Sequence, residues 1–180
     1  MSKTGTVKIK TKRFTLRKIY PWDIFSVYPW YTSEEISRFS ICRRAFTPFE
    51  AFKLCFGRCL KYHKKDYYYW GIEFKGKIIG LVNVTPYGSK EGRFSLCEKI
   101  DFRYNNQGVA TECVSAVLDY FKTQDIHEII YICDIENTAS KRVAEKAGMT
   151  PLGSPETNPK IKYDTGEIAK TYCFKFLYEI

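Results

Sequence analysis

The sequence predicts a mixed α/β fold, in which a mostly antiparallel central sheet of about six or seven strands carries helices on both faces. Three observations support this prediction. Three short strands separated by tight turns cover residues 67–101, which is typical of an antiparallel meander. A polar turn at residues 105–108 leads without a break into a helix with an apolar face. A near-continuous apolar run, EIIYICD at residues 128–134, is typical of a central strand covered on both faces.

The composition is that of a globular chain. Of the 180 residues, 44% are hydrophobic and 17% are aromatic, which argues against disorder and leads us to expect one domain over residues 1–180. No apolar run approaches the ~18 residues that a membrane span needs, and residues 1–14 lack the apolar core of a secretory signal. We therefore expect a cytoplasmic protein with no membrane contact.

The cysteines predict neither disulfides nor a metal centre. The seven cysteines, at positions 42, 55, 59, 97, 113, 133 and 173, contain no C-x-x-C pair, and most lie inside apolar patterns. We expect them to be buried, reduced thiols. His63 and His127 belong to no cluster with ligand spacing, so we expect no bound metal.

The net charge of +9 is unevenly distributed. Residues 1–20 contain seven lysines and arginines and no acidic residue, and a second basic cluster follows at residues 58–65. Such clusters indicate attraction to a polyanion, either a phosphorylated cofactor or nucleic acid. The alternative is a solvated basic surface that promotes solubility.

The N-terminal third contains one strand and two longer helices. Residues 11–19 alternate as a strand does, and Pro21-Trp22-Asp23 begins a helix that runs to Tyr31. Residues 32–35 suit a short helical turn. The run Thr47-Pro48-Phe49-Glu50 has the pattern of a capping box and starts a helix that extends to about residue 64.

The rest of the chain alternates strands with helices. The meander consists of strands at residues 67–74, 78–85 and 93–101, and the polar turn then begins a helix that ends near residue 121. After the apolar strand at 128–134, a helix starts at residue 137 and is closed by Gly148. Extended segments at residues 149–153 and 168–178 surround a turn at residues 163–167.

The polar turn is a candidate anion-binding site because it precedes a helix. Amide N–H groups in the first turn of a helix lack intrahelical acceptors and carry partial positive charge. The small and polar residues Asn105 to Gly108 would let a pyrophosphate approach those amides. An ordinary strand–helix connection explains the same residues. No Gly-Lys-Ser/Thr follows, and there is no GxGxxG fingerprint, so neither of those nucleotide motifs applies.

Three segments, in the same order and spacing, resemble the GNAT acetyltransferases, and in particular the subgroup that acetylates the N-termini of ribosomal proteins. They are TKRFTLRKIYPWD at residues 11–23, DFRYNNQGVATECVSAVLDYF at residues 101–121, and DIENTASKRVAEKAGMTPLG at residues 134–153. The resemblance spans nearly the whole chain. It implies a GNAT-like fold with a V-shaped splay between the strands at 93–101 and 128–134.

The resemblance also implies a cofactor, acetyl-CoA, and a set of residues that bind it. The family's pyrophosphate loop falls on Asn105, Asn106, Gln107, Gly108, Val109, Ala110 and Thr111, where Gly108 and Ala110 match the family pattern and Asn105 and Asn106 depart from it. The pantetheine arm would bind the backbone at Ile100, Asp101 and Phe102. Asn137 matches the asparagine that contacts this arm, and Ser140 matches a serine near the cofactor sulfur.

The implied mechanism is direct attack of a substrate amine on the thioester. Backbone N–H groups near residues 99–101 would stabilise the oxyanion, and Ser140 would give a proton to the CoA thiolate. Two family residues are absent: Ala144 replaces a common tyrosine, and Ser95 stands where others carry a glutamate base. The nearest acid is Glu98, which is either a second catalytic residue or a charge in a local pair on the other face of the strand.

These features predict an acetyl-CoA-dependent N-acetyltransferase acting on a primary amine. A protein α-amine fits better than lysine because a larger fraction of it is neutral at neutral pH. Association with the ribosome agrees with the basic charge. Alternatives are acetylation of a small molecule or antibiotic, a catalytically silent acyl-CoA-binding module, and a nucleic-acid-binding scaffold. We expect a monomer or a homodimer.

Overall fold

The computed structural model describes residues 5–39, 47–64, 66–89, 92–124, 126, 128–152, 160–161, 168–169 and 171–177. Their main sheet has eight strands in the order β1-β2-β3-β4-β5-β6-β10-β7, and every neighbouring pair is antiparallel except β5 and β6. The strands are β1 (Ile9–Lys10), β2 (Thr15–Arg17), β3 (Tyr68–Phe74), β4 (Lys77–Pro86), β5 (Arg93–Ile100), β6 (Glu128–Asp134), β7 (Thr150–Pro151) and β10 (Thr171–Leu177). β8 (Lys160–Ile161) and β9 (Ile168–Ala169) form a separate pair. The predicted fold class is confirmed.

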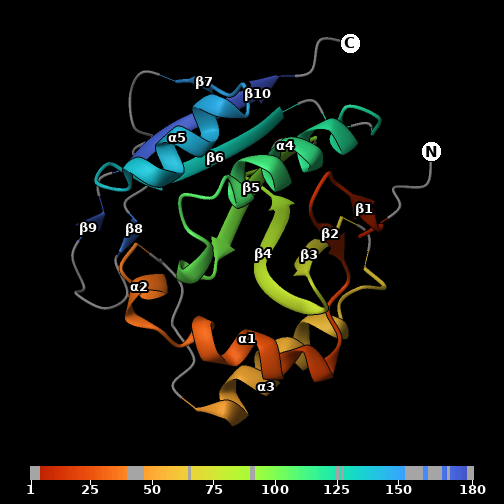
Figure 1. Cartoon of the computed structure of the whole chain (residues 1–180). Helices are drawn as coiled ribbons and strands as arrows, with labels where there is room; N and C mark the ends of the chain where they lie inside the picture. Colours follow the sequence, from red (N-terminus) through yellow and green to blue (C-terminus); the bar gives the residue numbers. More distant parts are fainter. Residues whose placement is uncertain are drawn as a thin grey trace.

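Helices cover both faces of the main sheet, as expected (Figure 1). On one face, α4 (Val109–Phe121) and α5 (Thr138–Lys146) cover a core to which β3, β4, β5 and β6 also contribute. On the other face, α1 (Ile24–Tyr31) and α3 (Pro48–Cys59) cover a smaller core with residues of β3 and β4. Two short 3-10 helices, η1 (Pro21–Asp23) and η2 (Phe102–Tyr104), and the one-turn helix α2 (Glu34–Ser37) lie in the connections.

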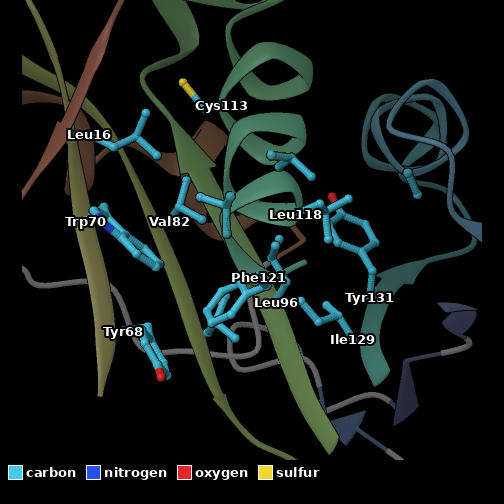
Figure 2. Packing of buried hydrophobic residues seen from close by; sticks show 14 of the residues in the cluster. Leu16, Tyr68, Trp70, Val82, Leu96, Cys113, Leu118, Phe121, Ile129 and Tyr131 are labelled. Atoms are coloured by element: carbon cyan, nitrogen blue, oxygen red, sulfur yellow. The ribbon is translucent and has the colours of Figure 1, made fainter. Parts of the chain in front are cut away.

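Apolar packing on the α4 face holds the two central strands to the helix. Figure 2 shows Phe121 and Leu118 of α4 pointing toward Leu96 of β5 and Ile129 of β6, all of which are at most 1% exposed. This burial is the expected source of most of the stability of such a layer, because it removes large apolar side chains from water.

β5 and β6 form a fork, which confirms the expected splay. Their parallel pairing starts at Arg93 and Glu128 and ends at Leu96 and Tyr131. Beyond that point β5 stays paired with β4 as far as Ile100, while β6 stays paired with β10. The two strands therefore separate, and the backbone edges that face the gap between them have no strand partner there.

Several predicted boundaries differ from the observed ones. The strand expected at residues 11–19 is reduced to β2, because Thr11 and Arg13 turn out of the sheet to bind Glu112 of α4. The helix expected to reach residue 64 ends at Cys59, where the amide of the next residue bonds the carbonyls of Phe56 and Arg58. The capping box at the start of α3 is confirmed. The expected turn at residues 163–167 lies outside the described residues.

Among the cysteines whose burial the structure describes, one is exposed, and the expectation for Cys42 and Cys173 lies outside the described side chains. Cys55, Cys113 and Cys133 are buried and Cys59 is partly buried, but Cys97 is exposed, which corrects the expectation for that residue. Cys97 follows the last residue of β5 that pairs with β6. Within the described part of the chain, no three His, Cys, Asp or Glu side chains are grouped so as to hold a metal, and no helix is long and apolar enough to cross a membrane.

Candidate active site

The polar turn forms an open cradle at the start of α4. Gly108 is the N-cap of the helix and has a left-handed backbone with a φ of 73°, and Asn106 has a φ of 60°. Residues 105–108 are exposed. The amides of the first helical turn lack intrahelical acceptors, so they present donors and partial positive charge at an accessible surface. This geometry suits a phosphate group.

Arg13 holds this cradle from outside the predicted motif. Its Nη1 donates to the carbonyl of Gln107 at 2.9 Å, and its Nε donates to Oε2 of Glu112 at 2.7 Å. A Cβ atom on Gly108 would lie 3.4 Å from Nη2 of Arg13. A guanidinium therefore lies beside the position where an anion would bind. No local signal singled it out, because Arg13 falls on the same polar face of the predicted strand as Thr15 and Arg17.

The end of β5 has backbone groups that point into the fork. The amide of Asp101 donates to the carbonyl of Ile79 on β4 at 2.8 Å. Because hydrogen-bonded pairs alternate along an antiparallel ladder, the backbone groups of Glu98 and Ile100 point the other way, toward β6. Ile100 is thus placed as expected for a contact with a ligand in the gap.

Asp101 and Phe102 are less available than expected. The amide of Asp101 is already donated to β4, and its carbonyl accepts from the amide of Tyr104 at 2.8 Å. The carbonyl of Phe102 accepts from the amide of Asn105 at 3.1 Å. The fully buried carboxylate of Asp101 pairs with Arg103 at 2.6 Å. These backbone bonds shape the turn that follows β5 and occupy the amide of Asp101, while the contact of a ligand with the backbone at residues 100–102 stays a prediction.

Asn137 and Ser140 lie together at the start of α5. Asn137 is the N-cap residue, and its Oδ1 accepts from the amide of Ser140 at 3.1 Å. This bond explains Asn137 as a helix cap, and among the described residues its side-chain nitrogen makes no hydrogen bond. Ala144, one turn further along α5, is fully buried in the apolar core, where it packs and reaches no ligand.

Glu98 occupies the fork together with a residue that the sequence did not single out. The hydroxyl of Tyr131 on β6 donates to Oε1 of Glu98 at 2.5 Å. Burial raises the pKa of Glu98, and hydrogen bonds from Tyr131 and Ser140 oppose that rise. Tyr131 is therefore bonded directly to Glu98, and Ser140 lies close enough to influence the same carboxylate. The signal that could have found Tyr131 was a single phenol inside the otherwise apolar strand EIIYICD, because a buried hydroxyl needs a partner.

The comparison with known protein families settles the family. A family model described as an acetyltransferase (GNAT) domain matches residues 13–150, more than half of the chain. The chain belongs to the GNAT acetyltransferases. Enzymes of this family take the acetyl group from acetyl-CoA, so the protein is an acetyl-CoA-dependent acyltransferase.

Two similar proteins come from Bacillus subtilis. The uncharacterized N-acetyltransferase YnaD is 47% identical over 51 residues, which is 28% of this chain and 30% of that protein. The uncharacterized N-acetyltransferase YoaA is 24% identical over 148 residues, which is 81% of this chain and 84% of that protein. The chain therefore spans less than a third of the first relative and most of the second.

Solved structures of GNAT enzymes share the fold over almost the whole chain. An acetyltransferase of the GNAT family from Bacillus anthracis has a TM-score of 0.80 at 23% identity and covers 95% of this chain and 98% of its own. The ribosomal-protein-S5-alanine acetyltransferase from Vibrio fischeri has a TM-score of 0.81 at 18% identity and covers 96% and 97%. The microcin C7 self immunity acetyltransferase MccE, in complex with acetyl-CoA and AMP, has a TM-score of 0.76 at 13% identity and covers 92% and 93%.

Proposed function

We propose that this protein acetylates the free α-amine at the N-terminus of a protein, in the cytoplasm, with acetyl-CoA as the acetyl donor. The observation that carries the proposal is the fork between β5 and β6, which has Ser140 and Glu98 at its side and the cradle of α4 at its mouth. Structures that share the fold include one whose name describes acetylation of a ribosomal protein. A ribosomal protein is therefore the substrate class to test first.

The residues around the fork fit acetyl-CoA. The exposed turn at residues 105–111 offers helix amides to the pyrophosphate, and Gly108 keeps the approach open because it has no side chain. Asn137 has a side-chain N–H group to donate to the pantetheine arm, and Ile100 offers backbone groups of the fork. When bound, acetyl-CoA supplies an acetyl thioester, an acyl group activated for attack by an amine.

The residues of the chain then have two tasks in the transfer. Backbone N–H groups in the fork, of which Ile100 has one, stabilise the negative charge that develops on the thioester oxygen. The hydroxyl of Ser140 gives a proton to the departing sulfur. Ala144 cannot take that role because it is a buried core residue with no polar atom.

An α-amine suits this site better than a lysine side chain does. At neutral pH a lysine amine, with a pKa of about 10.4, is almost fully protonated, whereas an α-amine, at about 7.7–8.0, has a substantial neutral fraction. Burial raises the pKa of Glu98, which makes its carboxylate a better proton acceptor than an exposed glutamate.

The acceptor is tested with matched peptides after calorimetry has measured acetyl-CoA binding. One peptide has a free N-terminus and no lysine, and the second has the same sequence with a blocked N-terminus and one lysine. We expect CoA release with the first peptide and little with the second. Turnover of simple amines alone would favour a small-molecule acetyltransferase, and tight acetyl-CoA binding without any turnover would favour a silent binding module.

The role of Ser140 is tested by Ser140→Ala. We expect kcat to fall by about 10²-fold or more, while the dissociation constant for acetyl-CoA stays within about twofold, because the lost hydroxyl acts on the leaving group and not on binding. Ser115→Ala is the matched control, since Ser115 is a partly buried residue on α4. An unchanged kcat in Ser140→Ala would remove the serine from its role.

A further inference from the structure

The bond between Glu98 and Tyr131 closes the narrow end of the fork. Tyr131 is opposite Leu96 in the last parallel pair of β5 and β6, and Glu98 lies two residues further along β5. The distance of 2.5 Å between Oη of Tyr131 and Oε1 of Glu98 is at the short end for a hydroxyl that donates to a carboxylate. The bond therefore ties the two strands at the point where they separate.

The surroundings of Glu98 are mostly apolar, so an ionised carboxylate is costly at this position. Tyr131 is 2% exposed and belongs to the apolar core on the α4 face. The residue opposite Glu98 on β4 is Val82, and α4 contributes apolar side chains. From α5, Ser140 lies near both Glu98 and Tyr131 and lowers the pKa of each. Among the described residues, no cationic side chain faces this carboxylate.

Tyr131 and Glu98 differ in which of them changes its protonation state. Burial, together with the neighbouring charge of Glu98, holds the pKa of Tyr131 well above its usual value. The phenol therefore keeps its proton near neutral pH. Glu98 is the member of the pair that takes up and releases a proton, because burial raises the pKa of this carboxyl group while the phenol stays protonated.

We propose that Tyr131 is a positioning residue for acetyl transfer, whose hydroxyl holds the carboxylate of Glu98 beside Ser140 at the fork of β5 and β6. The inference rests on the proposed function. It adds a residue of β6 to a site otherwise built from β5, the turn after it and the starts of α4 and α5, and it gives Glu98 a defined position.

The resulting proton transfers balance. The amine nitrogen forms a bond to the acetyl carbon, the bond between that carbon and sulfur breaks, and the nitrogen loses one proton. Glu98 accepts that proton and passes it to the oxygen of Ser140, while Ser140 gives its own hydroxyl proton to the sulfur. Both side chains return to their starting states, and Tyr131 keeps its proton throughout.

The test removes the hydroxyl of Tyr131 and keeps its ring, in Tyr131→Phe of the full chain. We expect kcat to fall about tenfold or more and the KM for acetyl-CoA to change by less than about twofold. The acid limb of the pH profile of kcat/KM should move to higher pH, because Glu98 loses a hydrogen bond that favours its ionised form.

Tyr68→Phe is the matched control. Tyr68 is a tyrosine of the same apolar core, is 1% exposed, and has a buried hydroxyl with no hydrogen-bond partner among the described residues. This variant should keep the kcat and pH profile of the wild type. Glu98→Gln tests the pathway: if Tyr131 acts through Glu98, adding Tyr131→Phe to it lowers kcat no further. A wild-type profile in Tyr131→Phe, or a fully additive double variant, would overturn the proposal.

A measurement without substrate separates this inference from the proposed function. Infrared difference spectra recorded against pH should show a carboxylic acid band that is absent in Glu98→Gln and that appears at higher pH in Tyr131→Phe than in the wild type. An active wild type with the same titration in both proteins would overturn the role of Tyr131 alone. An inactive wild type that shows the expected shift would overturn the proposed function while the pair of residues stands.

Discussion

Glu112 is a single side chain that links two distant parts of the chain at the cradle of α4. Its carboxylate accepts hydrogen bonds from Oγ1 of Thr11 at 2.7 Å, from the amide of Arg13 at 2.9 Å and from Nε of Arg13 at 2.7 Å. A negative charge in the first turn of α4 interacts favourably with the helix dipole, but it would repel a phosphate. The guanidinium of Arg13 neutralises that charge, which keeps the cradle suited to an anion.

The same residue predicts a pH-dependent contribution to stability. Burial would raise the pKa of Glu112, but the hydrogen bonds from Thr11 and Arg13 outweigh it, so the pKa is lowered in the folded state. The ionised form therefore adds stability that is present above the unfolded value of about 4.3 and is lost as the pH falls through the lower folded value.

We expect Glu112→Gln to lower the free energy of unfolding by about 1 kcal/mol at neutral pH, and we expect the difference to shrink as the pH falls below about 4. Urea unfolding at several pH values measures this. Glu145→Gln is the control, because that side chain is 48% exposed and lies 4.0 Å from its partner Lys141, so its effect should be small. A difference independent of pH would contradict the role of Glu112.

At the scale of elements, β4 and β5 approach closely next to the fork. Gly80 of β4 is opposite Ile100 of β5. A Cβ atom at Gly80 would lie 2.9 Å from the carbonyl oxygen of Lys99 and 2.9 Å from Cδ1 of both Ile72 and Ile100. The missing side chain lets the two strands meet where the backbone of Ile100 faces the gap.

Two glycine substitutions should therefore have opposite effects. Gly80→Ala should destabilise the protein by about 1–3 kcal/mol, because the backbone oxygen of Lys99 cannot move aside freely. Gly57→Ala should stabilise it by about 0.5–1 kcal/mol, since Gly57 is inside α3 and a Cβ there meets nothing within 4 Å. Chemical unfolding of both variants measures this. If Gly80→Ala were as stable as the wild type, the close approach of the strands would not limit this position.

At the scale of the whole molecule, the charge of +9 is the property that favours a polyanionic partner. Lys8 and Lys10 are exposed at the edge strand β1, where they add to this charge without entering the core. If the acceptor is a ribosomal protein on the assembled particle, this charge attracts the enzyme to the surrounding RNA.

We expect the protein to sediment with ribosomes at low ionic strength and to dissociate as salt is added. The double variant Lys8→Glu and Lys10→Glu should dissociate at lower salt, while its turnover of a free peptide should stay the same, since neither lysine is placed in the site. Salt-independent sedimentation would show that this charge does not mediate the association, and a loss of peptide turnover would mean that the variant disturbs the enzyme itself.

Patterns that depend on near neighbours in the chain were predicted correctly from the sequence. The meander of β3, β4 and β5, the helix α4 after its polar turn, and the capping box of α3 all follow from residue types within about four positions of one another. Such patterns also carried the resemblance to the GNAT family, and that resemblance led to the fork between β5 and β6. The ends of elements were less accurate, because contacts from elsewhere in the fold shortened β2 and α3.

The contacts that complete the candidate site came from the tertiary structure. Glu98 and Tyr131 are 33 residues apart, and Arg13 and Glu112 are 99 apart. Whether such residues meet depends on the register of β5 against β6 and on how the turn before β2 packs against α4, and no local pattern specifies either. The sequence therefore identified the family and the cofactor, and it predicted the loop that would bind that cofactor. Only the packing of strands against helices decided which buried side chains form a hydrogen bond at the fork, since a buried polar group must find its partner wherever the fold places one.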